Sequence, residues 1–197
     1  LRFHPSTRKH ATIGGFVAGG AAGCGSCSWG QISDLGAVRA VEVVTLEEAP
    51  RVIALAGEDV RTVLHAYGVN GIITAVELPL APWQPWAERV VAFPSLGAAA
   101  RFGHALGAAE GIAKKEIAVF DGRIAPFLKR LAPHVPPGSA FVITMVAEPQ
   151  ADALATLSAT HGGTFVYDRG WEEAEAAAFD GAGAMPPLYE YCWNHTT

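Results

Sequence analysis

Residues 12–30 (TIGGFVAGGAAGCGSCSWG) form a glycine-rich stretch whose backbone could bind an anionic ligand. The stretch has no charged side chain, and apolar residues such as Phe16 and Trp29 stand between its glycines, whereas flexible linkers are polar and rich in serine. Glycine adopts positive φ and lets the backbone approach a ligand with no side chain between them. Phosphate is the usual ligand of bare backbone N–H groups. We therefore predict a phosphate-binding segment, with a flexible linker as the alternative interpretation.

Cysteine and histidine residues offer a second kind of chemistry. Cys24 and Cys27 form a C-x2-C pair, and Cys192 and His195 form a C-x2-H pair, which together have the ligand spacing of a tetrahedral zinc site. The first pair, however, lies within the glycine-rich stretch, and cysteine is a common small residue in buried positions. We therefore expect packing cysteines and no metal site. A thioredoxin-like redox pair has less support, because Cys24 does not open a helix after a strand.

His195 is the polar residue outside the glycine-rich stretch with the clearest chemical potential. It follows Asn194 near aromatic residues that could line a pocket. A neutral imidazole can accept a hydroxyl proton near pH 7. A surface or hydrogen-bonded histidine is an equal alternative, and the residues leave both open. His65 lies at the end of an apolar helical pattern, so we expect it to be structural.

Composition limits the classes of function. The 197 residues can form one large domain or two small ones. The net charge of −5 and the absence of a Lys/Arg cluster argue against a nucleic-acid partner. The longest apolar run, residues 11–24, is too short and too rich in glycine to span a bilayer, so we expect no membrane partner. Three cysteines do not make a disulfide framework, which fits a cytoplasmic protein. No dinucleotide-binding G-x-G-x-x-G follows a strand and no P-loop is present, which argues against a Rossmann enzyme or a P-loop NTPase.

The elements that follow the glycine-rich stretch must hold it in place. Residues 38–46 are rich in β-branched side chains and predict a strand, with residues 51–56 as its hairpin partner. Residues 58–67 have the apolar spacing of a helix that ends at Gly68. Residues 71–80 predict a third strand.

The segment APWQPW, residues 81–86, is typical of a partly packed domain boundary. Beyond it the elements follow the order β-α-β-β-α-β of a ferredoxin-like sandwich. The predicted strands are 89–93, 116–120, 140–147 and 164–167, and the predicted helices are 95–110, 124–131 (a short one outside this order), 150–160 and 171–179. The fold class is therefore α+β, and we expect no pairing between strands 71–80 and 140–147.

Two motifs in this order resemble the FAD-linked oxidase family, whose members include vanillyl-alcohol oxidase, p-cresol methylhydroxylase, D-lactate dehydrogenase and the flavoprotein subunit of glycolate oxidase. The first is TIGGFVAGGAAGCGSCSWGQISD, followed by a VEVVT strand, and the second is HAYGVNGIITAVELPLAP. The family's first motif runs T-I-G-G, then small residues, then a Gly preceded by an aromatic residue, and its second ends in G-I-I-T before a strand. The resemblance covers residues 5–82, and the rest is similar to the family's cap domain in the order of its elements.

The resemblance implies two domains: residues 1–82 as the second part of a vanillyl-alcohol-oxidase-type FAD-binding domain, and residues 83–197 as a ferredoxin-like cap with a return segment. The cofactor-binding residues that it implies are Thr12, Ile13, Gly14, Gly15, Ala18 and Gly20 along the diphosphate and ribityl groups, Ser26, Trp29 and Gly30 near the flavin, and Gly71 and Ile72 at the adenine end.

The resemblance also implies an activity and a partner. The activity is FAD-dependent oxidation of a small hydroxylated substrate, such as a 2-hydroxy acid, by hydride transfer to flavin, with His195 as the catalytic base. The family's other phosphate-binding turn would precede these residues, so we expect a fragment that binds FAD weakly without the N-terminal half of the same protein. The sequence does not decide between a monomer and a homo-oligomer. The alternative is an inactive fragment or an α+β ligand-binding module without flavin.

Overall fold

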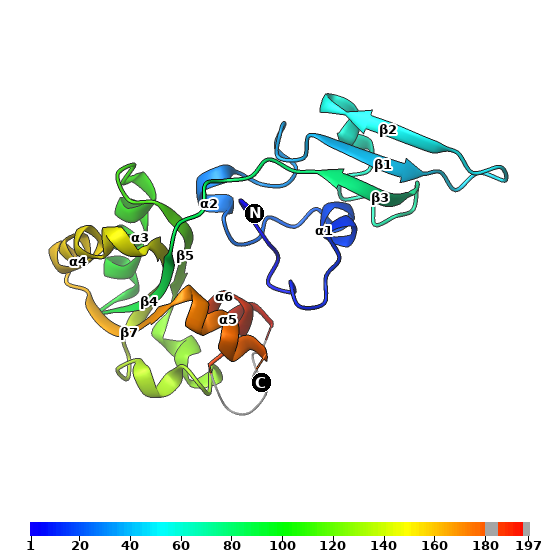
Figure 1. The fold of residues 1–197 in the computed structure, drawn as a ribbon. Coiled ribbons are helices and arrows are strands. Elements are labelled where there is room, and N and C mark those ends of the chain that lie inside the picture. The colour runs from blue at the N-terminus through cyan, green and yellow to red at the C-terminus, as the bar shows by residue number, and fades with distance from the viewer. Residues whose placement is uncertain (180–184, 195–197) are drawn as a thin grey trace. The chain divides into compact units, whose positions relative to one another are not determined.

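The computed structural model describes residues 1–179 and 185–194, which belong to two compact units, Leu1–Pro82 and Trp83–Thr197. We call them unit 1 and unit 2 (Figure 1). The chain passes from one to the other inside the proline-rich segment, where the Trp83 side chain is 81% exposed. In the described part of the chain, no helix has the length and apolar character needed to cross a membrane.

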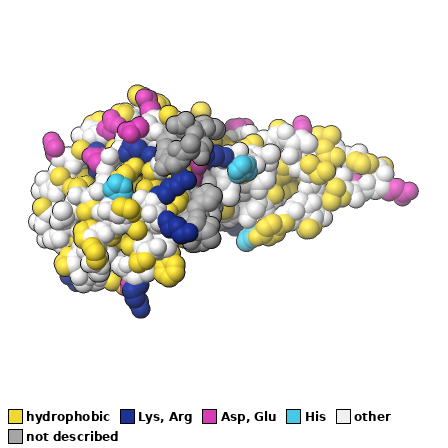
Figure 2. All heavy atoms as spheres, turned by 90° about the horizontal axis from the view of Figure 1, so that it is seen from below, with side chains coloured by type: hydrophobic (Ala, Val, Ile, Leu, Met, Phe, Trp, Pro, Cys, Tyr) yellow, Lys and Arg dark blue, Asp and Glu magenta, His cyan; other side chains and the backbone are white. Residues whose placement is uncertain are grey.

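Unit 1 is built on a small antiparallel sheet with the strand order β2-β1-β3. Its elements are α1 (Ile13–Gly19), α2 (Ser26–Trp29), β1 (Ala40–Val44), β2 (Val52–Ala56), the 3-10 helix η1 (Gly57–Thr62) and β3 (Ile72–Glu77). The predicted hairpin forms, with acidic side chains at its tip (Figure 2). Val41 and Val43 alternate with the exposed Glu42 along β1, so one face of the sheet packs against Phe16 and Val17 of α1.

The predicted helix over residues 58–67 is wrong beyond its first turn. Only η1 forms, and His65 and Tyr67 adopt left-handed φ values of 56° and 52°. The backbone N–H of Tyr67 donates to the carbonyl of Ala18 (3.0 Å), and that of His65 donates to the carbonyl of Val17 (3.5 Å). These residues therefore bond to the end of α1 instead of continuing their own helix, and tertiary contacts override the local pattern.

Unit 2 is a ferredoxin-like sandwich, as predicted. Its sheet has the order β5-β6-β4-β7, every pair is antiparallel, and the two helices of the motif are α3 and α4. The strands are β4 (Trp86–Phe93), β5 (Lys114–Phe120), β6 (Ala140–Ala147) and β7 (Thr164–Gly170). The helices are α3 (Leu96–Ala108), η2 (Gly122–Phe127), η3 (Ala132–His134), η4 (Glu148–Gln150), α4 (Ala151–Thr160), α5 (Trp171–Phe179) and α6 (Leu188–Asn194).

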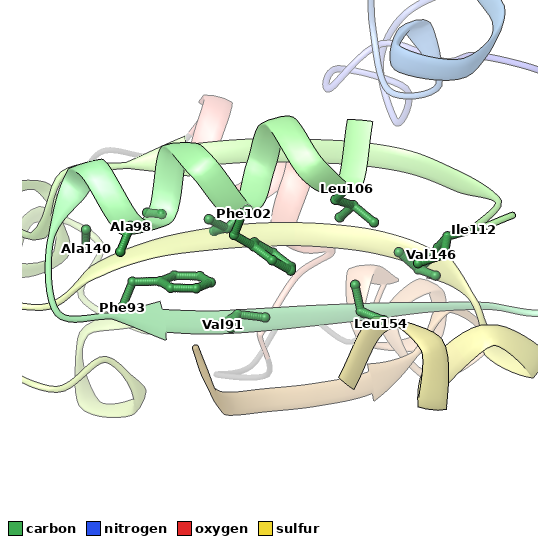
Figure 3. Close-up of a cluster of buried hydrophobic side chains, with 11 residues drawn as sticks. Val91, Phe93, Ala98, Phe102, Leu106, Ile112, Ala140, Val146 and Leu154 are labelled. Atoms are coloured by element: carbon green, nitrogen blue, oxygen red, sulfur yellow. The ribbon is translucent and has the colours of Figure 1, made fainter. Parts of the chain in front are cut away.

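Both faces of the unit 2 sheet are covered, so β4 and β6 are buried along their whole length. Helices α3 and α4 cover the first face, where Phe102 and Leu106 lie over Val91 and Phe93 (Figure 3). The second face carries a separate core. Its members are Val90, Phe141 and Ile143 of the sheet, Ala125, Leu128, Leu131 and Val135 of the η2–η3 region, and Leu188, Tyr191 and Cys192 of α6.

Two differences from the expected elements lie on this second face. The predicted helix over residues 124–131 is replaced by the 3-10 turns η2 and η3, because Pro126 and Pro133 cannot donate the backbone hydrogen bonds of an α-helix. Helix α6 was not expected. It supplies three buried side chains to the core and ends directly before His195, which lies outside the described residues.

Candidate functional site

The start of the glycine-rich stretch folds into the short, capped helix α1. Thr12 is its N-cap, and its Oγ1 accepts a hydrogen bond from the backbone N–H of Gly15 (3.0 Å). Gly20 ends the helix with a left-handed φ of 67° and donates to the carbonyls of Phe16 and Val17. Thr12, Ile13 and Gly15 are exposed, so the beginning of α1 is accessible from solvent.

Two glycines of this segment, Gly14 in α1 and Gly20 at its C-cap, lie close to other parts of unit 1. A Cβ on Gly14 would lie 3.2 Å from the carbonyl oxygen of Ile73 in β3, and one on Gly20 would lie 2.6 Å from the Cβ of His65. Gly14 thereby lets α1 pack on β3, and His65, which is exposed, lies against Gly20. Ala18 is half-buried, and its carbonyl accepts from Tyr67. The sequence predicts that these glycines allow a ligand to approach closely. In the structure, Gly14 and Gly20 instead allow two segments of the protein to approach each other.

The second part of the stretch is organised by contacts with the N-terminus and with a following turn. His4 and Cys24 exchange both backbone hydrogen bonds, at 3.0 and 2.8 Å, and a Cβ on Gly25 would overlap the carbonyl of Arg2. Helix α2 begins at the half-buried Ser26 and is followed by Gly30, whose φ of 78° is left-handed. Trp29 packs on the core of unit 1, so only part of its ring is available to a ligand.

The structure brings one subset of the predicted cofactor residues together. Because Gly14 contacts Ile73, the exposed Thr12, Ile13 and Gly15 lie on the helix that packs on β3, the strand that Ile72 begins. Gly71 is buried against Val43, which leaves no room for a side chain, whereas Ile72 is 58% exposed. The result is an exposed surface at the start of α1, with Thr12, Ile13 and Gly15 next to β3 and with Lys9 and His10 exposed just before them in the chain.

The Thr12 cap gives a direct test of this local structure. Replacing Thr12 by Ala should destabilise unit 1 by about 1 kcal/mol, because the Gly15 N–H loses its acceptor. Urea denaturation of wild-type and variant protein measures the change. Thr12→Ser keeps the hydroxyl and should stay close to wild type, and equal losses in both variants would contradict the capping role.

The remaining chemical candidates are the three cysteines and His195, and His195 lies outside the described residues. Cys24 is buried as expected, but Cys27 is exposed, so the prediction of a packing residue is wrong for Cys27. Among residues 1–179 and 185–194 there is no group of three or more His, Cys, Asp or Glu arranged to hold a metal ion. Burial, and then Glu116 and Glu88, raise the pKa of the Cys192 thiol to about 12, so this thiol is not a nucleophile near neutral pH.

A row of buried charges in unit 2 was not anticipated from the sequence. Glu88 of β4 is 0% exposed, and its Oε2 lies 3.0 Å from Nη2 of Arg169 in β7. Its Oε1 accepts from the backbone N–H of Leu188 (2.7 Å). Burial raises the pKa of Glu88 to about 7, although the Arg169 hydrogen bond opposes the rise. The available signal is the Glu88–Arg89 pair of charged residues inside the otherwise apolar sequence of β4.

Glu116 of β5 belongs to the same row. It is 5% exposed, and neither carboxylate oxygen has a partner at hydrogen-bond geometry. Burial and the nearby Glu88 raise the pKa of Glu116 well above its usual range. The Trp193 indole partly opposes this through a weaker hydrogen-bonding interaction.

Comparison with known proteins gives a likeness of fold. No family model and no curated protein matches the chain. Among solved structures, alkyldihydroxyacetonephosphate synthase superposes with a TM-score of 0.65 and 16% identity, covering 86% of this chain and 37% of that one. A second crystal form gives a TM-score of 0.63 and 15% identity over 86% of this chain and 35% of that one. The chain thus spans about a third of the length of these neighbours, and it shares with that part of them the α+β fold expected for a partial vanillyl-alcohol-oxidase-type domain.

Proposed function

We propose that this chain is part of an FAD-dependent oxidoreductase, with unit 1 contributing to the FAD site and unit 2 acting as the cap domain. Three lines support the proposal: the two motifs that resemble FAD-linked oxidases, the fold shared with part of alkyldihydroxyacetonephosphate synthase, and the surface at the start of α1. The surface is the observation that carries it, because it is exposed and next to the GIIT strand.

The residues at this surface fit a dinucleotide in their chemistry. Thr12 and Ile13 would bind its phosphate and ribityl region, because a hydroxyl and backbone N–H groups can donate to phosphate oxygens. The Gly15 N–H already donates to Thr12 Oγ1, so Gly15 would contribute close approach and no donor. Ile72 offers an apolar contact to the adenine end. The glycines that flank α2 are not open to a ligand, because Gly25 is buried and Gly30 is half-buried. When bound, FAD supplies hydride acceptance, and the protein supplies position and electrostatics.

The proposed substrate is a small hydroxylated molecule, such as a 2-hydroxy acid. His195 would remove the hydroxyl proton, a role that a neutral imidazole can fill near pH 7. Oxidation is proposed from the motif resemblance alone, since the structural neighbours are named as a synthase. We also propose that tight FAD binding needs the other half of the FAD-binding domain.

The first test is to map FAD on the chain by NMR. We expect shift changes at Thr12, Ile13, Gly15 and Ile72, with a dissociation constant near 1 mM or weaker, equivalent to about −4 kcal/mol. Ile72→Glu should weaken binding further, because it replaces the apolar contact to the adenine with a negative charge on an anionic ligand's binding surface. Val52→Glu is the matched control: Val52 is an exposed β-branched residue on β2, on the opposite side of β1, and should leave binding unchanged.

Other outcomes of the titration would separate the alternatives. Tight stoichiometric binding would show that unit 1 alone suffices for FAD, against the expected need for another half. Millimolar FAD without shift changes in unit 1 would favour an α+β module without flavin. That alternative has support in the structure, because contacts within the protein account for Gly14, Gly20 and Gly25.

A further inference from the structure

We propose that residues 185–193 form a proton-dependent clamp on the second face of the unit 2 sheet. The segment stays docked while the Glu88–Glu116 pair holds a proton, and it opens when that proton is lost. The proposal concerns unit 2 alone and does not depend on flavin binding.

The strand register places the charged groups in one row. Arg169 of β7 pairs with Glu88 of β4, Glu88 pairs with Met145 of β6, and Met145 pairs with Glu116 of β5. Residues paired directly across antiparallel strands project from the same face of a sheet. The row therefore crosses the whole sheet on the face where α6 contributes to the core.

The clamp is attached to two members of this row. The backbone N–H of Leu188 donates to Oε1 of Glu88 (2.7 Å), and the Arg169 guanidinium donates to the carbonyls of Met185 and Pro186, the latter at 3.0 Å. At the other end of α6, Trp193 packs near Phe120 of β5, with ring centroids 6.3 Å apart. The segment is thus held from β7 across to β5.

A third attachment fixes the middle of α6. The Tyr191 hydroxyl accepts a hydrogen bond from the backbone N–H of Arg130 (2.9 Å), in the connection between η2 and η3. Leu188, Tyr191 and Cys192 are buried in the second core. Opening the clamp would expose the apolar residues Val90 and Phe141 beneath it.

The charge count makes the docked state sensitive to protons. The Arg169 guanidinium bonds to Glu88, one of the two buried carboxyl groups of the row. Glu116 has no cation and no hydrogen-bond partner at ordinary geometry among the described residues. Burying an ionised carboxylate without a partner is very costly, so the docked state favours a neutral Glu116. Opening admits water, which stabilises the ionised form.

Within the described part of the chain, Arg169 is the cation that acts on Glu88, and no cation acts on the pKa of Glu116. Glu190 of α6 raises the pKa of Glu88, while Glu173 of α5 acts on the Tyr167 phenol, where burial raises the pKa. The ring of His134 in η3 packs against Tyr167, with centroids 5.1 Å apart, and the Arg169 guanidinium lies 5.6 Å from the centroid of the same Tyr167 ring. The groups that face the row are therefore mainly acidic or neutral.

The direction of the pH effect follows from the raised pKa values. Glu88 and Glu116 hold protons more tightly in the docked state than in water, so docking is favoured at low pH and weakened as pH rises. Each carboxyl can increase the opening constant by up to about tenfold per pH unit between its open-state and docked-state pKa. Above about pH 7, ionisation of Glu88 no longer increases the opening constant, whereas ionisation of Glu116 still does.

Hydrogen exchange of the full chain from pH 5 to pH 8.5, detected by mass spectrometry and corrected for intrinsic exchange, tests the clamp. We expect the opening of residues 185–193 to increase with pH and to keep increasing above pH 7, while β6 stays protected. Glu116→Gln keeps the shape without the charge, so its opening should level off above pH 7. Glu110→Gln is the control, because Glu110 is an exposed carboxylate of unit 2 that takes no part in the row, and it should match wild type.

Three results would overturn the proposal. The first is opening of residues 185–193 that does not change with pH. The second is a Glu116→Gln profile that rises above pH 7 as steeply as wild type. The third is loss of protection in β6 in parallel with residues 185–193, because unit 2 would then unfold as a whole and no clamp would open separately.

Discussion

Replacing Phe102 by Ala should lower the free energy of unfolding of unit 2 by about 3–5 kcal/mol. Phe102 is fully buried on the inner face of α3, and its ring lies 5.0 Å from that of Phe93 in β4 and 6.2 Å from that of His161. Removing the ring leaves a cavity between a helix and the centre of a sheet, where neighbouring side chains can collapse only partly (Figure 3).

The loss can be measured from the slowest exchanging amides of β6, which report the unfolding of unit 2. Leu96→Ala is a control on the same helix, because Leu96 is exposed and should change stability by about 0.5 kcal/mol or less. A loss below about 1 kcal/mol for Phe102→Ala would mean that α3 is not part of the cooperative core.

The architecture of unit 2 could be predicted because its strands have a strong local signal. Residues 140–147 are a continuous apolar run, and the structure forms β6 over the same residues. Ser95 precedes the predicted helix, and its Oγ accepts from the N–H of Ala98 as an N-cap. Local propensity, apolar pattern and tertiary packing agree in these elements.

Prediction failed where contacts distant in sequence decide the backbone. Residues 58–67 have a helical pattern, but the Tyr67 N–H bonds to Ala18, which lies far away in the sequence. The apolar spacing of residues 124–131 resembles a helix, but Pro126 prevents one. For residues 58–67, the competing hydrogen bond cannot be seen in the local sequence. For residues 124–131, the local sequence itself contains the proline that disfavours an α-helix.

The candidate site shows the same limit. A glycine permits close approach but does not say what approaches. Gly14 faces Ile73 and Gly25 faces Arg2, so both serve packing, while the exposed Gly15 keeps a role at the proposed FAD surface. The buried pair of Glu88 and Arg169 could not be predicted, because it depends on the pairing of β4 with β7, whose register no local pattern specifies.

Arg169→Met should have the second large effect, a loss of about 3–5 kcal/mol in the stability of unit 2 at pH 8. The guanidinium and the Glu88 carboxylate are both buried, so the variant leaves a negative charge with no cation. The carbonyl of Pro186 also loses its donor. Exchange of the β6 amides in wild type and variant measures the loss.

The loss should be smaller near pH 5, and this separates charge from packing. With Arg169 present, burial already raises the pKa of Glu88 to about 7, and removing the cation raises it further. In the variant, Glu88 is therefore neutral at pH 5. At pH 8 the folded variant must either bury its charge without a cation or take up a proton, and both cost free energy. On folding, Glu88 of the wild-type protein also takes up a proton between pH 4.5 and 7, so its stability changes with pH as well. The stabilities of wild type and variant are therefore compared at the same pH.

A double variant, Glu88→Gln with Arg169→Met, completes the argument. The glutamine side chain would still offer an oxygen to the Leu188 N–H but carries no charge, so the double variant should be more stable at pH 8 than Arg169→Met alone. The difference between single and double variants should disappear towards pH 5, where the Glu88 carboxyl of the single variant is protonated. If Arg169→Met loses the same stability at pH 5 and pH 8, and the second change restores nothing, the guanidinium acts by packing alone. The row of buried charges would then have no electrostatic role in holding residues 185–193 on the sheet.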